Sequence, residues 1–192
     1  MASINRIVMS KSSRTWIRAL GPEGLDTAEI SGSSGKNFPF RSYKVFHYPE
    51  YDICAAPLGE QEGTGRQFDL IMADQVWEHL DRPYAATKHV LASLKPGGFF
   101  WLAVPFFVPL HAAPVDNSRW SARGLKNLLI ECGFAEEDIV ADQWGNRWAG
   151  MRNVVGPFPP VYYPETDRLD NEEDFPVCAW ALAQKAEPAD VD

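Results

Sequence analysis

The side chains best suited to acid–base chemistry lie in two short segments of the sequence. One segment holds Glu78 and His79, and the other holds His111 and Asp116, followed by Arg119. A histidine titrates near neutral pH, so it can take a proton from a hydroxyl or an amine, and a neighbouring carboxylate can orient it. His111 with Asp116 is the first candidate for such an oriented base, and His79 is the second. The alternative roles are structural: His79 would brace the next helix, and Arg119 would tie Asp116 into a loop clamp.

Both segments follow predicted strands of one supersecondary unit. The apolar pattern predicts a strand over 68–73, a helix over 83–94 and, after a Pro-Gly-Gly turn, a second buried strand over 99–104. Two such strands joined by a helix form a right-handed parallel βαβ unit. Ligands of open parallel sheets bind beyond the carboxyl ends of the strands, so we expect the chemistry at residues 74–79 and 105–111.

The remaining elements extend this unit in both directions. Before it, the patterns predict a helix over 14–20 capped by Ser12 or Ser13, strands over 25–30 and 42–47, and a very short strand over 52–55. After it, they predict a helix over 122–132 capped by Ser121, and strands over 138–143 and 177–183. Only six residues separate the loop at 31–35 from the next strand, so that crossover either holds about one helical turn or is irregular.

This order predicts an α/β fold with a Rossmann-like, doubly wound and mostly parallel sheet. No helix separates the last two strands, so they are either antiparallel neighbours or distant, and an antiparallel final strand fits best. The connection over 144–176 is rich in proline and aromatic residues, which is typical of a functional lid or a disordered segment. We expect one domain over 14–185, with flexible termini over 1–13 and 186–192.

Composition narrows the class of protein. A net charge of −8 and a pI near 5.0 argue against a nucleic-acid partner. No apolar run is long enough to span a bilayer, and the N-terminal residues lack the apolar segment of a signal peptide, so we expect no membrane partner and a cytoplasmic location. Three widely spaced cysteines favour free thiols. The histidines and cysteines show no metal-binding spacing, so no metal site is expected.

With this pattern in view, the chain resembles the class I S-adenosylmethionine-dependent methyltransferases over nearly all of 14–185. The segments that carry the resemblance are AEISGSSG (28–35), FDLIMADQVWEHLDRP (68–83), LKPGGFFWLAVP (94–105), HAAPVDNSRWSARGLKNLLIECGF (111–134) and VCAWALAQK (177–185). The resemblance implies a sheet of the class I type, here with an abbreviated first half, and S-adenosylmethionine as the cofactor.

The resemblance also implies which residues hold the cofactor. Glu29 and the loop after it would bind the methionine portion, and Asp74, Gln75 and Trp77 would line the cofactor's edge. The loop residues assigned are Ser31, Gly32, Ser33 and Gly35; two serines stand where the family has its first two glycines. The alternative roles are structural: 31–35 would be a polar turn, the Glu29 carboxylate would bind only the loop amides, and 74–75 would be a solvated turn.

The family's acidic residue at the end of the second strand is missing. Phe46, His47 and Tyr48 occupy that place, so His47 and Asp52, or Glu50, would have to serve the ribose hydroxyls.

Two functions from different classes follow. In the first, the protein transfers a methyl group to O, N or C of a small-molecule acceptor, with 144–176 as the acceptor lid and a possible homodimer completing the site. In the second, the degenerate glycine motif marks a catalytically silent domain that binds or scaffolds a partner. A nicotinamide-dependent oxidoreductase is disfavoured, because the glycine fingerprint of a dinucleotide fold is absent.

Overall fold

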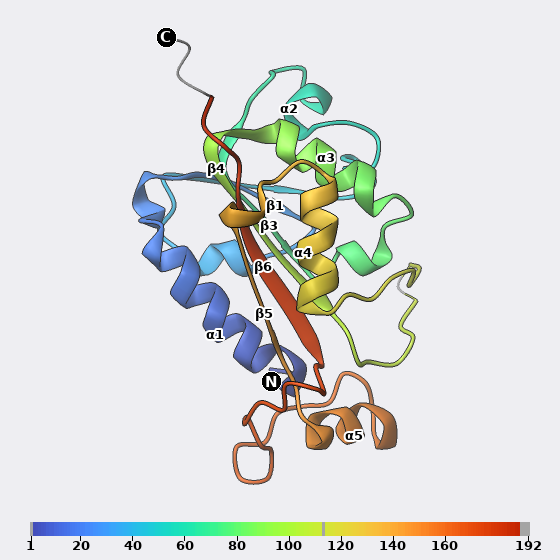
Figure 1. The fold of residues 1–192 in the computed structure, drawn as a ribbon. Coiled ribbons are helices and arrows are strands. Elements are labelled where there is room, and N and C mark those ends of the chain that lie inside the picture. The colour runs from blue at the N-terminus through green and yellow to red at the C-terminus, as the bar shows by residue number, and fades with distance from the viewer. Residues whose placement is uncertain (1, 113, 189–192) are drawn as a thin grey trace.

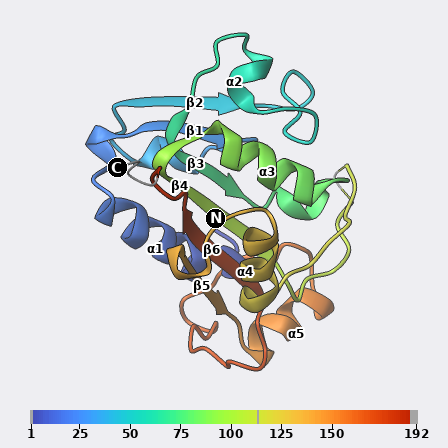
Figure 2. The same ribbon diagram turned by 45° about the horizontal axis from the view of Figure 1, so that its top comes forward.

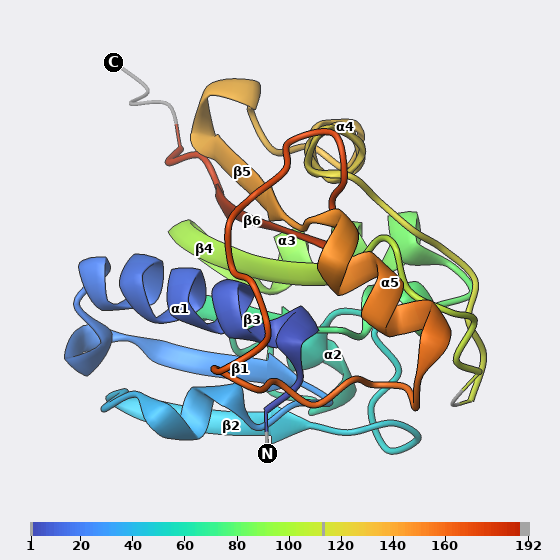
Figure 3. The ribbon, with the colours of Figure 1, turned by 90° about the horizontal axis from the view of Figure 1, so that it is seen from below.

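The centre of the fold is a six-stranded sheet with the order β2-β1-β3-β4-β6-β5. The structure is a computed structural model that describes residues 2–112 and 114–188. The strands are β1 (Asp26–Ile30), β2 (Ser42–Phe46), β3 (Phe68–Asp74), β4 (Leu94–Pro105), β5 (Ile139–Trp144) and β6 (Cys178–Gln184). β6 alone runs antiparallel to its neighbours, β4 and β5. Figure 3 shows the strands in this order from one edge of the sheet to the other.

Helices cover both faces of the sheet. They are α1 (Ile4–Ala19), α2 (Leu58–Gln61), α3 (Pro83–Ser93), α4 (Ala122–Glu131) and α5 (Arg147–Val155). α1 lies on one side of the sheet, and α3 and α4 lie on the other (Figure 2). Alternate residues of the central strands therefore enter two cores: Leu70 and Met72 pack with α1, whereas Ile71 and Ala73 pack with α3 and α4. Burial on both faces explains why β3 reads as a continuous apolar run.

The central βαβ unit and the antiparallel final strand confirm the predicted fold class. The crossover between β1 and β2 is a single 3₁₀ turn, Ser34–Asn37, so the first half of the sheet is abbreviated as expected. Ser121 caps α4, because its hydroxyl accepts a hydrogen bond from the Gly124 N–H. β5 and β6 are antiparallel neighbours. None of the helices in the described chain is long and apolar enough to cross a membrane.

The prediction for the N-terminus was wrong. The first helix begins at Ile4, not at residue 14, and Ser3 caps it by accepting a hydrogen bond from the Asn5 N–H. Ile4 and Met9 are buried against the sheet, so the folded domain includes most of residues 1–13. The polar residues of this segment form the exposed face of an amphipathic helix, which hid the pattern. At the other end, residues 189–192 lie outside the described residues.

Two further expectations were wrong. Residues 52–55 form a turn and not a strand, since Asp52 accepts a hydrogen bond from the Cys54 N–H instead of entering the sheet. The connection over 144–176 contains α5, which Asn146 caps by accepting a hydrogen bond from the Ala149 N–H.

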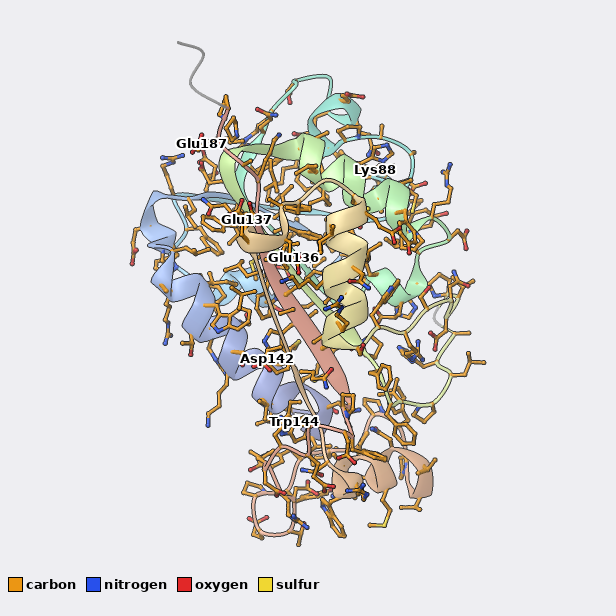
Figure 4. The ribbon with its side chains drawn as sticks, viewed as in Figure 1. Lys88, Glu136, Glu137, Asp142, Trp144 and Glu187 are labelled. Carbon is orange, nitrogen blue, oxygen red and sulfur yellow. The ribbon has the colours of Figure 1, made fainter. Side chains whose placement is uncertain are left out.

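The rest of that connection is held to the body of the protein rather than loose. The indole of Trp144 donates to the Leu169 carbonyl. The Ile4 N–H donates to the Pro160 carbonyl, and the Tyr162 N–H donates to the Ala2 carbonyl. Trp144 lies at the end of β5 beside this connection (Figure 4). α5 and the start of α1 thus lie at the edge of the sheet where β4 ends (Figure 1).

Candidate functional site

The loop after β1 is organised around the carboxylate of Glu29. This side chain is fully buried, and its two oxygens accept hydrogen bonds from the Ser34 and Gly35 N–H groups, each at 2.8 Å. The Tyr43 hydroxyl of β2 donates a third hydrogen bond to it. Burial and the nearby Glu29 raise the pKa of Tyr43, so the phenol remains a donor. Two of the three hydrogen bonds to the Glu29 carboxylate therefore hold the loop, which is the structural role that the sequence left open.

Two residues at the carboxyl ends of the strands adopt left-handed backbone conformations. Ser31, directly after β1, has φ of 54°, and Gln75, directly after β3, has φ of 58°. Such a conformation costs a non-glycine residue about 1–2 kcal/mol. Strain of this kind is typical of functional sites. Directly after Ser31, a Cβ on Gly32 would lie 1.9 Å from Glu29 Oε1, so a side chain there would displace the Glu29 carboxylate from its hydrogen bonds.

Asp74 links this loop to the centre of the sheet. Its carboxylate accepts hydrogen bonds from the Ser34 hydroxyl and from the Trp101 indole, the latter at 2.6 Å. The Gln75 N–H donates to the Ala103 carbonyl on β4 at 2.8 Å. The structure therefore brings the predicted cofactor residues at 29–35 and 74–75 together at one edge of the sheet. Ser33 is exposed within this loop.

Three other predicted cofactor residues differ in their surroundings. His47 lies exposed at the end of β2, on the same edge of the sheet. Asp52 holds its own turn together through the Cys54 N–H. Trp77 points into the core: it is fully buried, and its indole donates to the Thr87 hydroxyl at 2.9 Å. The placement of Trp77 on the cofactor's edge was wrong, because it packs beneath α3 with Phe100.

A second group of polar side chains gathers where β3 and β4 end. Glu78 Oε1 lies 3.6 Å from His79 Nε2 and 3.8 Å from His111 Nε2. The rings of His79 and His111 meet edge to face, with centroids 5.2 Å apart. The Asn117 N–H donates to the Glu78 carbonyl at 2.7 Å, which fixes the segment after β4 over the end of β3. Folding thus joins two segments that are far apart in the sequence.

Glu78 is the most unusual group of this cluster. Its side chain is fully buried, and neither carboxylate oxygen has a hydrogen-bond partner in the part of the chain that the structure describes. Burial raises the pKa of Glu78 to about 7, although the nearby His79 opposes the shift. Groups with such shifted pKa values are concentrated at functional sites. In the sequence Glu78 is notable only as the neighbour of the candidate base His79. Its burial in the structure is what identifies it as a candidate functional group.

Asp116 contacts His111 in the segment after β4. His111 Nδ1 lies 3.2 Å from Asp116 Oδ2, and the His111 N–H donates to the same oxygen at 2.8 Å. Arg119 pairs with Asp116 through two nitrogens and also donates to the Pro109 carbonyl. The Arg119 guanidinium holds the pKa of Asp116 well below its usual range. Arg119 and Asp116 thus form the clamp, and the same contacts hold His111; the role of His111 as a base stays a prediction.

The fold and this edge of the sheet define a class of protein. The sheet has parallel strands, with an antiparallel strand inserted next to its edge strand β5, and a polar site lies beyond the carboxyl ends of the parallel strands. These are the features of a class I S-adenosylmethionine-dependent methyltransferase. The family model described as a methyltransferase domain matches residues 12–158, and the chain belongs to this family. No curated protein matches the sequence significantly.

Solved structures with the same fold are distant in sequence. The 1,6-didemethyltoxoflavin-N1-methyltransferase of Burkholderia thailandensis, solved with 1,6-didemethyltoxoflavin and S-adenosylhomocysteine, has a TM-score of 0.60 and 13% identity; the match covers 95% of this chain and 80% of that one. A methyltransferase of Thermotoga maritima, described as a possible histamine N-methyltransferase, has a TM-score of 0.56 and 15% identity, with 94% and 97% covered. A methyltransferase of Archaeoglobus fulgidus has a TM-score of 0.51 and 13% identity, with 92% and 94% covered.

Proposed function

We propose that this protein transfers a methyl group from S-adenosylmethionine to an O, N or C atom of a small-molecule acceptor that carries an ionisable proton. The observation that supports the acceptor class is the cluster of Glu78, His79 and His111 beyond the carboxyl ends of β3 and β4, the end of the sheet that also carries the proposed cofactor loop. A buried carboxylate between two imidazoles is suited to hold and move a proton. The neighbouring structures with bound S-adenosylhomocysteine support the choice of cofactor.

The loop at 31–35 would bind a ligand through its main chain. Glycine at position 32 lets the loop pack closely on Glu29, and Glu29 and Tyr43 hold the loop in place. S-adenosylmethionine supplies a methyl group already activated by its sulfonium. The main chain at 31–35, with Asp74 and Gln75, would hold it and align it with the acceptor, and alignment at about 3 Å accounts for most of the catalysis required.

At the acceptor, His111 would take the proton. Its Nδ1 faces Asp116 and the Pro109 carbonyl, so Nε2 carries the free lone pair. As the acceptor atom bonds to the methyl carbon, its proton passes to this nitrogen, and Glu78 stabilises the imidazolium that forms. His79, whose Nδ1 contacts the Val115 carbonyl, is the second candidate for the base. Phe158, with its ring centroid 5.2 Å from that of His111, would cover the acceptor from the connection after α5.

One observation favours the alternative of a catalytically silent domain. A Cβ on Gly35 would lie 2.2 Å from the Tyr43 ring, so Tyr43 fills the space directly beside the loop. If the cofactor needs that space, the domain would act as a binding or scaffolding partner instead. Cofactor binding separates the two functions.

The test is a calorimetric titration with S-adenosylmethionine and S-adenosylhomocysteine. Gln75→Asn shortens a side chain at the proposed site, keeps its amide group, and introduces a residue type that tolerates the left-handed conformation. Gln67→Asn makes the same change at the opposite end of β3 and is the control. We expect both ligands to bind the native protein and Gln75→Asn alone to weaken them. A folded native protein that binds neither ligand would overturn the proposal in favour of the silent domain.

A further inference from the structure

The cluster at the ends of β3 and β4 has the composition of a metal site. Glu78, His79 and His111 each offer one ligand atom, and these atoms all lie within 4.8 Å of one another. Two ligands that lie about 2.1 Å from one cation, at tetrahedral or octahedral angles, are about 3.0–3.4 Å apart. The separations of 3.6 and 3.8 Å from Glu78 Oε1 to the two Nε2 atoms need to shorten by only a few tenths of an ångström.

The carboxylate of Glu78 lacks the partners that a buried charge requires. It is fully buried, and no donor of the described residues forms a hydrogen bond with either oxygen. A buried carboxylate is costly unless it is paired, hydrogen-bonded or bound to a metal. Both imidazoles lie beyond hydrogen-bond distance, yet their nitrogens are the nearest cation ligands. A cation between the three groups would satisfy all of them at once.

Both histidines are oriented as metal ligands usually are. A histidine that binds a metal through one ring nitrogen donates the other N–H to a carbonyl or carboxylate. His79 Nδ1 contacts the Val115 carbonyl, and His111 Nδ1 lies 3.2 Å from both the Pro109 carbonyl and Asp116. These contacts place the proton on Nδ1 and leave the two Nε2 lone pairs facing Glu78.

We propose that Glu78, His79 and His111 together bind one divalent transition-metal cation, with zinc as the first candidate. Two imidazoles favour such a cation over magnesium or calcium, which prefer oxygen ligands. Three protein ligands leave at least one position open for water or for an acceptor oxygen. A cation there would take the lone pair that His111 would otherwise offer to a proton. It would instead lower the pKa of an acceptor bound at the open position, and the proton released by that acceptor would pass to water.

The binding test does not rest on the proposed function, since neither cofactor nor acceptor is needed. The protein is stripped of metal with a chelator, dialysed near neutral pH, and titrated with zinc by calorimetry and with cobalt(II) by visible absorption. We expect one equivalent of each metal to bind, with cobalt(II) showing the d–d bands of a site with nitrogen and oxygen ligands. Circular dichroism of each sample shows that the protein is folded.

Single substitutions assign the ligands. Glu78→Gln keeps the shape and removes the charge, and His79→Asn and His111→Asn each remove one imidazole; each should weaken zinc binding at least about 100-fold. Asp116→Asn, which acts only through His111, should weaken it about 10-fold. His89→Asn is the matched control, because His89 Nδ1 also contacts a carbonyl, that of Ile53, at 2.8 Å. It should bind zinc like the native protein.

Two results would overturn the metal site. One is a folded native protein that binds neither zinc nor cobalt(II) at one equivalent. The other is stoichiometric binding that survives both Glu78→Gln and His111→Asn, which would locate the metal elsewhere. Cofactor binding by a protein that takes up no metal would leave the methyl-transfer proposal intact and remove only this one.

Discussion

Replacing Glu29 with alanine tests whether this carboxylate holds the loop or binds the cofactor directly. In the structure it accepts hydrogen bonds from the Ser34 and Gly35 N–H groups and from the Tyr43 hydroxyl, and it is fully buried. Glu29→Ala leaves these three donors without their acceptor. A buried donor that loses its partner costs about 1–3 kcal/mol.

The expected loss of stability follows from these contacts. Ser34 and Tyr43 are half-buried, so water can reach their donors, whereas Gly35 is buried. We therefore expect Glu29→Ala to lower the free energy of unfolding by about 3–5 kcal/mol, a large part of the total stability of an ordinary domain. Tyr43→Phe removes one of the three hydrogen bonds and should cost about 1–2 kcal/mol. In the double variant, Tyr43→Phe should add almost nothing, because both changes remove the same contact.

The assay is urea unfolding followed by circular dichroism, combined with calorimetric titration of S-adenosylmethionine under native conditions. The structure predicts that Glu29→Ala loses stability and cofactor affinity together, and that Tyr43→Phe loses part of each. A Glu29→Ala variant that is as stable as the native protein but no longer binds the cofactor would refute this reasoning. Glu29 would then be a direct ligand, as the sequence alone favoured.

Three other predictions concern strain, acid and thiols. Ser31→Gly relieves the left-handed backbone and should raise the free energy of unfolding by about 0.5–1 kcal/mol, after the entropy of the unfolded glycine is subtracted; a urea midpoint that falls would contradict this. Asp26 accepts hydrogen bonds from Arg41, which lowers its pKa, so its stabilisation is present above the ordinary aspartate pKa and is lost as the pH falls below it. Because the pair is partly exposed, Asp26→Asn should cost only about 1 kcal/mol near neutral pH and progressively less as the pH falls from 4 to 2, whereas an equal difference in urea unfolding at pH 7 and pH 2 would argue against the pairing. Burial raises the pKa of Cys178 to about 12, so iodoacetamide should label it only after urea unfolding; rapid labelling of the native protein, seen by peptide mass spectrometry, would exclude the burial described.

The sequence predicted the sheet well because the central strands are buried on both faces. Such strands read as continuous apolar runs, and the helix between β3 and β4 has a proline at its start. The Pro-Gly-Gly turn predicted after this helix was wrong, because β4 begins directly at Leu94 and includes these residues. The first helix was predicted ten residues too late, because two of the five residues that it buries, Asn5 and Ser13, are polar and interrupt the apolar pattern. α5 was missed within a segment whose prolines and aromatics indicate a loop.

The site was predictable only in part. Strand order alone places the loop at 31–35 beside residues 74–75, and the Asp116 contact with His111 is local in the sequence. Trp77 was misplaced because a tryptophan after a strand can face either the ligand or the core. Here it faces the core, because its indole donates to Thr87 on α3. The meeting of Glu78 with His111 depends on how the segment after β4 folds back, which no local pattern encodes.

The most direct measurement of the central claim is the transfer of label from S-adenosylmethionine carrying a tritiated methyl group. The purified protein is incubated with this cofactor and a low-molecular-weight cell extract, and the labelled product is separated and identified. The account predicts label in a small molecule, loss of this product with His111→Asn, and retention with His89→Asn. A folded protein that binds the cofactor but labels no small molecule, or one whose His111→Asn variant labels it at the native rate, would contradict the account.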